Sequence, residues 1–146
     1  KSDLAYYEAV VKPMLAGTGV EFVGEHSERA QADFLGRASA LLFPIDWPEP
    51  FGLVMIEAMA CGTPIIAYPC VSVPEVVTPG VTGWIVRSES EALDAIARLD
   101  AFDRAACRRV FDERFTAERM ARDYLRIYRK ITLLPRRTPS VRRAAA

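Results

Sequence analysis

Hydrophobic residues along the chain follow two alternating spacings, and the alternation predicts a mixed α/β fold. Short runs of consecutive apolar residues are typical of strands buried on both faces of a parallel sheet. Apolar residues three and four positions apart are typical of helices. The strand-like runs are Val20–Val23, Ala40–Phe43, Pro64–Ala67 and Gly83–Val86. Because helical patterns separate them, we expect parallel βαβ units that form a Rossmann-like sheet flanked by helices.

The helices are predicted from apolar stripes together with residues that suit helix ends. Ser27 is a good N-cap for the helix that follows it, and Gly62 is a natural end for a helix over Leu53–Cys61. The other predicted helical segments are Leu4–Leu15, one turn at Glu75–Val77, a helix from Ser88 or Ser90 to Leu99, and the ranges 103–110 and 116–134.

Length and composition are those of one ordinary globular domain. The chain has 146 residues, of which 51% are apolar and 26% charged, which excludes a disordered chain, a collagen or a coiled coil. No apolar run is long enough to span a bilayer, and the first residues do not resemble a secretory leader. Since the sequence does not begin with Met, we expect a piece of a longer protein.

Charge is balanced overall but not along the chain. Nineteen basic residues match nineteen acidic ones, yet residues 135–146 hold four arginines and no acid. The remaining 134 residues therefore carry four more acids than bases, which argues against nucleic-acid binding. The basic tail fits either a frayed end or a contact with a membrane surface or an acidic partner.

Cysteine and histidine usage argues against disulfides and metal. The three cysteines, Cys61, Cys70 and Cys107, are odd in number and show no CxxC spacing. They indicate buried thiols in a reducing compartment, the cytoplasm. A chain with His26 as its only histidine offers no zinc ligand set.

The segment Pro44–Pro64 carries the residues best suited to chemistry. Three prolines stiffen the loop that presents Glu49, and Gly52 lets the backbone approach a ligand closely. A helix then begins, so the amides of about Gly52–Met55 are expected to lack intrahelical partners and to suit a phosphate. Glu57 lies about one turn further and could accept both hydroxyls of a ribose. Together these groups suit a nucleotide-diphosphate-sugar.

Physical reasoning alone leaves a plainer interpretation open. Glu49 is equally consistent with an exposed loop charge, and Glu57 with a solvated position on a helix. The glycine would then serve only the turn.

A resemblance favours the functional interpretation. Glu49 and Glu57 are separated by seven residues, and the string EPFGLVMIEAMACGTPIIA resembles the E-x7-E motif of the retaining glycosyltransferases of family 4, the group 1 family. The flanking strings VEFVGEHS, ALLFPIDWPEPFG and VPEVVTPGVTGWIV agree with it. The resemblance runs from about Tyr6 to Tyr128 and implies the C-terminal, donor-binding Rossmann-like domain of a GT-B enzyme.

The resemblance implies a role for each residue of the motif. Glu49 matches the glutamate that contacts the donor sugar and helps stabilise the reacting centre, and Glu57 matches the one that binds the ribose. The backbone amides of four intervening residues are expected to hold the sugar and the phosphates: Phe51 and Gly52 for the sugar, Leu53 and Val54 for the phosphates. Gly24, Glu25 and His26 match the loop that lines the nucleobase.

The resemblance also implies the reaction and its partners. Residues 1–134 are expected to bind a UDP-, GDP- or ADP-sugar, with no metal or other cofactor required, for transfer with retention at the anomeric carbon. The acceptor, a glycan, a lipid or a small molecule, is expected to bind an N-terminal domain that this chain lacks. This chain alone is therefore expected to be inactive, in a cytoplasmic or membrane-peripheral protein.

Two features depart from the family pattern. The resemblance implies a basic cluster that neutralises the diphosphate, and we expect it to lie upstream of the first residue of this chain. Many relatives also carry Gly, often after Arg, where this chain has Cys70 and Val71. A β-branched residue does not easily adopt a positive φ, so we expect this loop to differ from theirs.

Two alternatives come from other functional classes. The chain could be a free-standing module that binds a nucleotide or nucleotide-sugar without catalysis. It could also be an assembly piece whose missing first βα unit leaves a sheet edge that pairs with a second copy in a homodimer. A dinucleotide-dependent dehydrogenase is disfavoured, because Phe22 stands where the third glycine of its fingerprint is needed.

Overall fold

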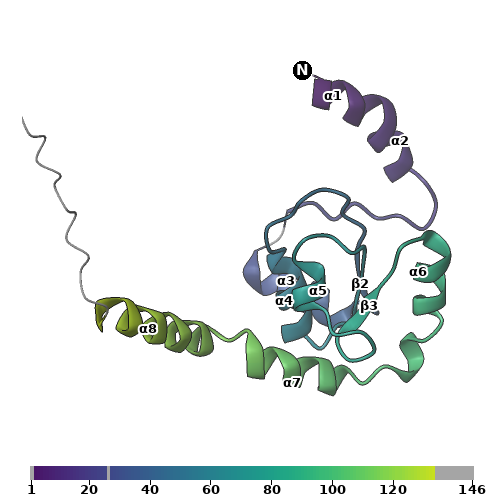
Figure 1. Cartoon of the computed structure of the whole chain (residues 1–146). Helices are drawn as coiled ribbons and strands as arrows, with labels where there is room; N and C mark the ends of the chain where they lie inside the picture. Colours follow the sequence, from purple (N-terminus) through teal and green to yellow (C-terminus); the bar gives the residue numbers. More distant parts are fainter. Residues whose placement is uncertain (1, 26, 134–146) are drawn as a thin grey trace, which may run out of the picture. The chain divides into compact units, whose positions relative to one another are not determined.

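The computed structural model describes residues 2–25 and 27–133, and the chain divides into two compact units (Figure 1). Residues up to Phe34 form the first unit, and residues from Leu35 onward form the second. The basic tail over 135–146 lies outside the described residues, so the expectations for it stay predictions.

The first unit begins with a nearly continuous helical run. It comprises α1 (Ser2–Tyr6), the π-helical turn η1 (Tyr7–Val11) and α2 (Lys12–Leu15), which confirms the helix predicted over Leu4–Leu15. The widened turn ends just before Pro13. Proline has no amide hydrogen and its ring clashes with the carbonyl four residues earlier, so a local change of helix type is expected there.

The strand predicted at Val20–Val23 is absent from the structure. Val20, Phe22 and Val23 are exposed, and the segment is irregular. A strand needs a neighbour to satisfy its amides and carbonyls, and no strand is assigned among the described residues of the first unit. The prediction was wrong because an apolar run gives a preference for extended backbone but not a partner.

The second unit is built on a parallel sheet with the order β1-β2-β3. The strands are β1 (Leu41–Phe43), β2 (Ile65–Ala67) and β3 (Gly83–Ile85), each within the range predicted from the sequence. Their registers align Leu41 with Ile65 and Ile65 with Gly83. All three strands therefore end at the same edge of the sheet, where the connecting loops begin.

The helices of the chain from Ser27 onward start and stop close to the predicted residues. The hydroxyl oxygens of Ser27 and Ser88 accept hydrogen bonds from Ala30 at 3.5 Å and Glu91 at 3.2 Å, so both serve as caps. The helices are α3 (Glu28–Arg37), α4 (Leu53–Ala60), α5 (Val73–Val76), α6 (Glu89–Ile96), the 3₁₀ turn η2 (Leu99–Ala101), α7 (Arg104–Arg114) and α8 (Ala117–Leu133).

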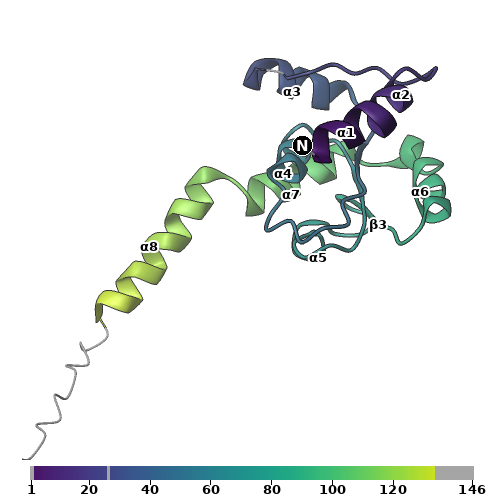
Figure 2. The same cartoon turned by 90° about the horizontal axis from the view of Figure 1, so that it is seen from above.

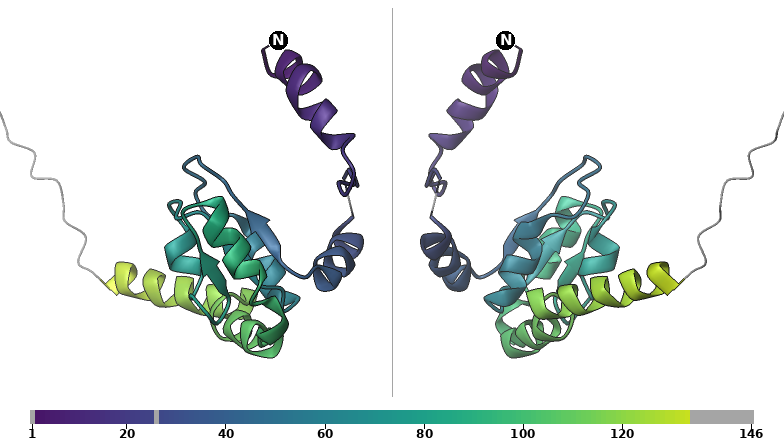
Figure 3. Two further views of the ribbon diagram at one scale, coloured as in Figure 1. Left: turned by 90° about the vertical axis from the view of Figure 1, so that its right-hand side faces the viewer. Right: turned by 90° about the vertical axis from the view of Figure 1, so that its left-hand side faces the viewer.

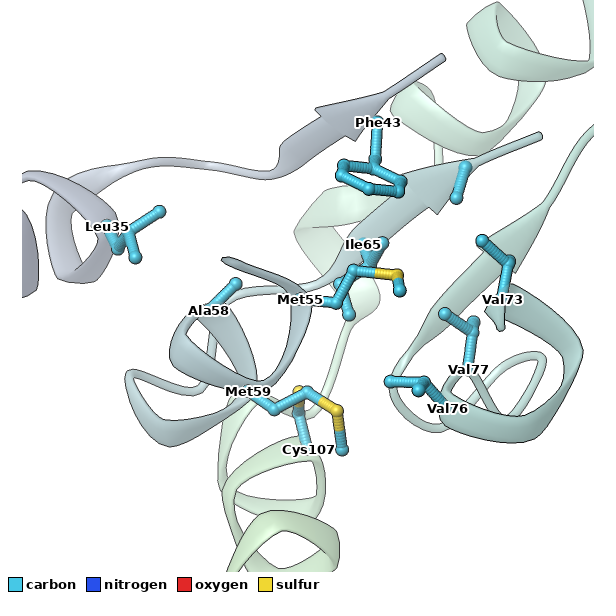
Figure 4. Close-up of a cluster of buried hydrophobic side chains, with 11 residues drawn as sticks. Leu35, Phe43, Met55, Ala58, Met59, Ile65, Val73, Val76, Val77 and Cys107 are labelled. Carbon is cyan, nitrogen blue, oxygen red and sulfur yellow. The ribbon is translucent and has the colours of Figure 1, made fainter. Parts of the chain in front are cut away.

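Helices cover both faces of this sheet, as expected (Figure 2). On one face Phe43 and Ile65 pack with Met55 and Met59 of α4, with residues of α5, and with Cys107 of α7 (Figure 4). On the other face Ile66 packs with Ala95 of α6. Met55, Met59, Ile65 and Cys107 have no exposed surface, so the larger core anchors α4 to the sheet.

Arg104 on α7 ties together segments that are far apart in the sequence. Its guanidinium donates to the carbonyl oxygens of Ala38 at 2.8 Å and Gly36 at 2.9 Å, and to the hydroxyl oxygen of Thr63 at 2.8 Å. The Thr63 hydroxyl in turn donates to the carbonyl of Leu35 at 2.7 Å. The end of α3 and the turn after α4 are therefore fixed to the start of α7.

α8 is a separate helix that follows α7 after a short turn (Figure 3). The stripe predicted from Met120, Tyr124, Ile127 and Ile131 lies on it, and all four side chains are exposed. None of the described helices is long and apolar enough to cross a membrane.

Candidate functional site

The loop between β1 and α4 presents the predicted motif at the carboxyl end of the sheet. Pro44, Pro48 and Pro50 limit its backbone freedom, and the amide of Glu49 donates to the carbonyl of Trp47 at 2.7 Å. Glu49 itself is half-buried. The loop is therefore a restrained turn that places one carboxylate beside the start of α4.

Gly52 starts α4 in a conformation that few other residues adopt. Its φ is +73°, in the left-handed region. A Cβ at this position would lie 2.9 Å from Cε of Met55 and 3.0 Å from Cζ of Phe43, both of which belong to the buried core. Backbone conformation and space both require glycine here, so the chain enters the helix with no side chain over its first turn.

Of the four amides predicted to lack partners over Gly52–Met55, two have acceptors in the structure. The Gly52 amide donates to Oε1 of Glu49 at 3.2 Å, and the Met55 amide donates to the Gly52 carbonyl at 3.0 Å. Leu53 and Val54 occupy the first two helical positions, whose amides have no intrahelical acceptor. In the described part of the chain these two amides are the open donors of the turn.

Glu57 lies on α4 and is half-buried. It follows Leu53 by four residues, so the two share one face of the helix. The predicted carboxylate and the open amides thus lie on the same helix, about one turn apart. The structure brings Glu49, the amides and Glu57 onto one loop-helix element, as the motif predicts.

A second loop, residues 68–72 after β2, holds the first loop in place. The hydroxyl of Ser72 donates to the carbonyl of Phe51 at 2.9 Å, and the thiol of Cys70 donates to the carbonyl of Trp47. Among the described residues only glycines have positive φ, so the backbone at Val71 is not left-handed. The difference from the family pattern at this loop stays a prediction.

A hollow of about 580 Å³ lies where the three strands end. Sequence analysis assigned no role to its polar side chains, Asp46, Tyr68 and Arg87. Each of them closely follows a predicted strand. Ligands bind at the carboxyl ends of strands in such sheets, so this position could have marked the three residues as candidates. Glu49 and Glu57 do not line this hollow, but Trp47 and Pro48 of the same loop do.

The predicted nucleobase loop belongs to the first unit. Gly24 has a φ of +70° and Glu25 is exposed, whereas His26 lies outside the described residues. Its assignment to the base stays a prediction. Among the residues that the structure describes, no cluster of three or more His, Cys, Asp or Glu side chains could hold a metal ion.

A family profile described as glycosyl transferases group 1 matches residues 2–102. The chain belongs to the group 1 glycosyl transferases. The match covers more than half of the sequence and includes the loop-helix element that carries Glu49 and Glu57. The family resemblance found in the sequence is thereby confirmed.

Solved and curated relatives agree with this family. The chain is similar to sucrose-phosphate synthase from Thermosynechococcus elongatus, with 33% identity and a TM-score of 0.70 over 90% of this chain and 35% of that one. This likeness confirms the expected GT-B fold. The chain also shares 39% identity over 72 residues with D-inositol 3-phosphate glycosyltransferase of Mycobacterium tuberculosis, which is 46% of this chain and 15% of the relative.

A further relative shares a longer stretch with this chain. It is an uncharacterized 41.2 kDa protein in the cps region of Klebsiella pneumoniae, 35% identical over 96 residues, 61% of this chain and 26% of that protein. This group 1 glycosyl transferase chain thus spans about a quarter of that relative, and less of the inositol phosphate enzyme.

Proposed function

We propose that the chain is the donor-binding part of a retaining glycosyltransferase that takes its sugar from a nucleotide-diphosphate-sugar. The observation that carries the proposal is the loop-helix element itself. The helix begins with two open amides, those of Leu53 and Val54. The carboxylate of Glu49 lies just before the helix, and that of Glu57 lies about one turn into it. Family membership supports the same assignment.

Each group of this element has a task in the proposed reaction. The amides of Leu53 and Val54 and the positive end of α4 bind the diphosphate and stabilise the negative charge that it gains on leaving. The carboxylate of Glu57 accepts hydrogen bonds from the ribose hydroxyls, and Glu49 accepts them from the sugar. Because one oxygen of Glu49 already accepts the Gly52 amide, the carboxylate is oriented before the donor arrives.

The transfer exchanges one bond at the anomeric carbon for another. The bond from that carbon to the phosphate oxygen breaks, and the diphosphate leaves with the electron pair. An acceptor hydroxyl oxygen forms the new bond, and the products are the glycosylated acceptor, the nucleoside diphosphate and one proton. The residues of this chain contribute binding and electrostatic stabilisation, and we propose no metal in these steps.

Nucleotide binding tests the proposal directly. The chain is titrated with UDP, GDP, ADP and their sugar conjugates while its unfolding temperature is followed. A nucleotide at 100 times its Kd stabilises a protein by about 2.7 kcal/mol, which raises the Tm of a chain of this size by roughly 5–11 °C. We expect one base to give this shift and the others to give less.

Glu57→Gln is the decisive variant, and Glu118→Gln on the exposed surface of α8 is its matched control. Hydrogen bonds to charged groups contribute about 1.5–3 kcal/mol, so Glu57→Gln should weaken nucleotide binding roughly 10- to 100-fold. Equal affinities of the wild type and both variants would contradict the proposal, as would the absence of a shift with every nucleotide.

A binding module without catalysis and a glycosyltransferase would both bind the nucleotide, so an activity measurement is needed to distinguish them. We expect the full-length polypeptide that contains this chain to transfer sugar from the donor whose nucleotide binds here. A full-length protein that binds the donor and releases no nucleoside diphosphate with any acceptor would favour the binding module.

A further inference from the structure

The hollow at the ends of the three strands carries polar groups that the donor site does not use. Arg87 brings a guanidinium, Asp46 a carboxylate and Tyr68 a hydroxyl. Within the described ranges, none of these three side chains forms a hydrogen bond or an ion pair. An open hollow of about 580 Å³, with charged groups that have no protein partner, has the size and chemistry of a small-molecule site.

The three polar groups are arranged in the order of the strands. Asp46 follows β1, Tyr68 follows β2 and Arg87 follows β3. Neighbouring strands lie about 4.8 Å apart, so the ends of β1 and β3 are separated by about 10 Å. The negative and the positive group therefore follow the two outer strands of the sheet, and the hydroxyl follows the middle strand.

This arrangement selects a ligand with two different ends. A guanidinium binds phosphate through parallel hydrogen bonds, which makes the Arg87 end suited to a phosphate monoester. A carboxylate only accepts hydrogen bonds, so the Asp46 end suits hydroxyl groups and repels an anion. Trp47, which is 62% exposed, offers an apolar ring face beside the carboxylate.

We infer that this hollow binds a phosphorylated polyol, such as a sugar phosphate or a cyclitol phosphate, as the acceptor of the transfer. The phosphate lies at Arg87 and the hydroxyl-rich end lies at Asp46 and Tyr68. This inference rests on the proposed function, because an acceptor site is meaningful only if the neighbouring loop-helix element binds the sugar donor. It moves part of acceptor recognition onto the donor-binding chain.

The shared loop explains why the two ligands would meet. Asp46 and Trp47 precede Glu49 by three and two residues, and the loop is fixed to residues 68–72 by the bonds of Ser72 and Cys70. The hydroxyl-rich end of the acceptor would therefore lie on the side of the loop that leads to Glu49. The phosphate, which does not react, would lie at the far strand.

Nuclear magnetic resonance of the two tryptophan indoles tests this inference. Trp47 lines the hollow, whereas Trp84 is half-buried and packs with Phe102 on the second face of the sheet. The probes are glucose 6-phosphate, fructose 6-phosphate and myo-inositol 1-phosphate, each compared with its unphosphorylated form and with inorganic phosphate. We expect at least one probe to move the Trp47 signal saturably and to leave the Trp84 signal in place.

Arg87→Gln and Arg98→Gln form the matched pair for the phosphate contact. Both arginines are exposed, but only Arg87 lines the hollow. We expect Arg87→Gln to weaken the sugar phosphate at least tenfold and Arg98→Gln to leave its affinity unchanged. Trp47→Phe assigns the indole signals.

Separate ligands keep the two proposals distinguishable. Nucleotide affinity depends on Glu57 if the proposed function holds, and sugar phosphate affinity depends on Arg87 if the inference holds. No response of Trp47 to any of the three phosphates would overturn the inference and leave the donor site intact. A Trp47 response to nucleotide-sugars alone, lost in Arg87→Gln, would also overturn it, since the hollow would then hold the donor.

Discussion

Two neighbouring strands of the sheet lead into helices that begin very differently. After β1 the chain enters α4, an eight-residue helix that leaves the amides of Leu53 and Val54 open. After β2 it enters α5, a four-residue helix in which Val73 donates to Cys70 and Glu75 donates to Ser72. The residue between them, Pro74, has no amide hydrogen.

Under the proposed function, this difference assigns ligand binding to α4 and support to α5. Both helices bury apolar side chains against the same face of the sheet, so packing does not distinguish them. The start of α4 leaves two amide donors open, whereas the start of α5 uses its donors internally. Ser72 precedes α5 yet donates its hydroxyl to Phe51 in the other loop. The second loop-helix element therefore holds the first one in shape.

The largest expected effect comes from closing the open start of α4. Gly52→Ala adds a Cβ that meets Met55 and Phe43 in a left-handed conformation. Backbone strain of about 1–2 kcal/mol and overpacking of about 1–3 kcal/mol should lower the free energy of unfolding, and nucleotide binding should be lost. Urea denaturation and nucleotide titration measure both effects.

Gly80→Ala is the matched control for this substitution. Gly80 has a φ of +77°, but a Cβ there would have no atom within 4 Å. It should cost only the backbone strain and leave nucleotide binding unchanged. Equal destabilisation by the two substitutions would show that the tight space at Gly52 is not important.

Alkaline pH should destabilise the core that packs against α4, because the buried thiol of Cys107 loses its proton there. Burial raises the pKa of the Cys107 thiol from its ordinary 9.0 to about 11, although the nearby Arg104 lowers it in part. Between these values the folded chain keeps a proton that the unfolded chain has lost, so stability falls as pH rises from 9 toward 11. Each pKa unit corresponds to 1.36 kcal/mol, so the full loss is about 2–3 kcal/mol.

Urea denaturation of the wild type and of Cys107→Ala across this pH range measures the effect. The free energy of unfolding of the variant should fall less steeply above pH 9 than that of the wild type. Parallel curves for the two proteins would mean that the thiol does not titrate differently in the folded and unfolded chains.

The smallest effect should come from separating the two loops. Ser72→Ala removes the hydroxyl that donates to Phe51, a hydrogen bond worth about 1 kcal/mol. The lost restraint on the first loop should weaken nucleotide binding a few-fold, which calorimetric titration can detect. Ser90→Ala on exposed α6 should change neither quantity, and an unchanged nucleotide affinity in Ser72→Ala would refute the supporting role.

Local patterns were enough to predict the elements of the second unit. Consecutive apolar residues predict β1 to β3, and Ser88 or Ser90 predicts the start of α6, because these features act over a few residues; the structure selects Ser88 as the cap. Val20–Val23 has the same apolar character, but whether such a run becomes a strand depends on a partner elsewhere in the chain. Propensity alone does not contain that information.

Some features of the candidate site also follow from local sequence, whereas others depend on the three-dimensional fold. The motif spacing predicts that Glu49 and Glu57 share one loop-helix element, and the structure places them so. The capture of the Gly52 amide by Glu49 depends on how the loop folds back, which spacing does not specify. The grouping of Asp46, Tyr68 and Arg87 depends on strand order, so it became visible only in three dimensions.

Arg104 has a consequence for the speed at which the fold is lost. Its three partners lie 41 to 68 residues away along the chain, so its bonds close only after those segments have been brought together. Interactions that form after the folding transition state slow unfolding more than they speed folding. Replacement of Arg104 should therefore shorten the lifetime of the folded second unit while the time needed to reach it changes little.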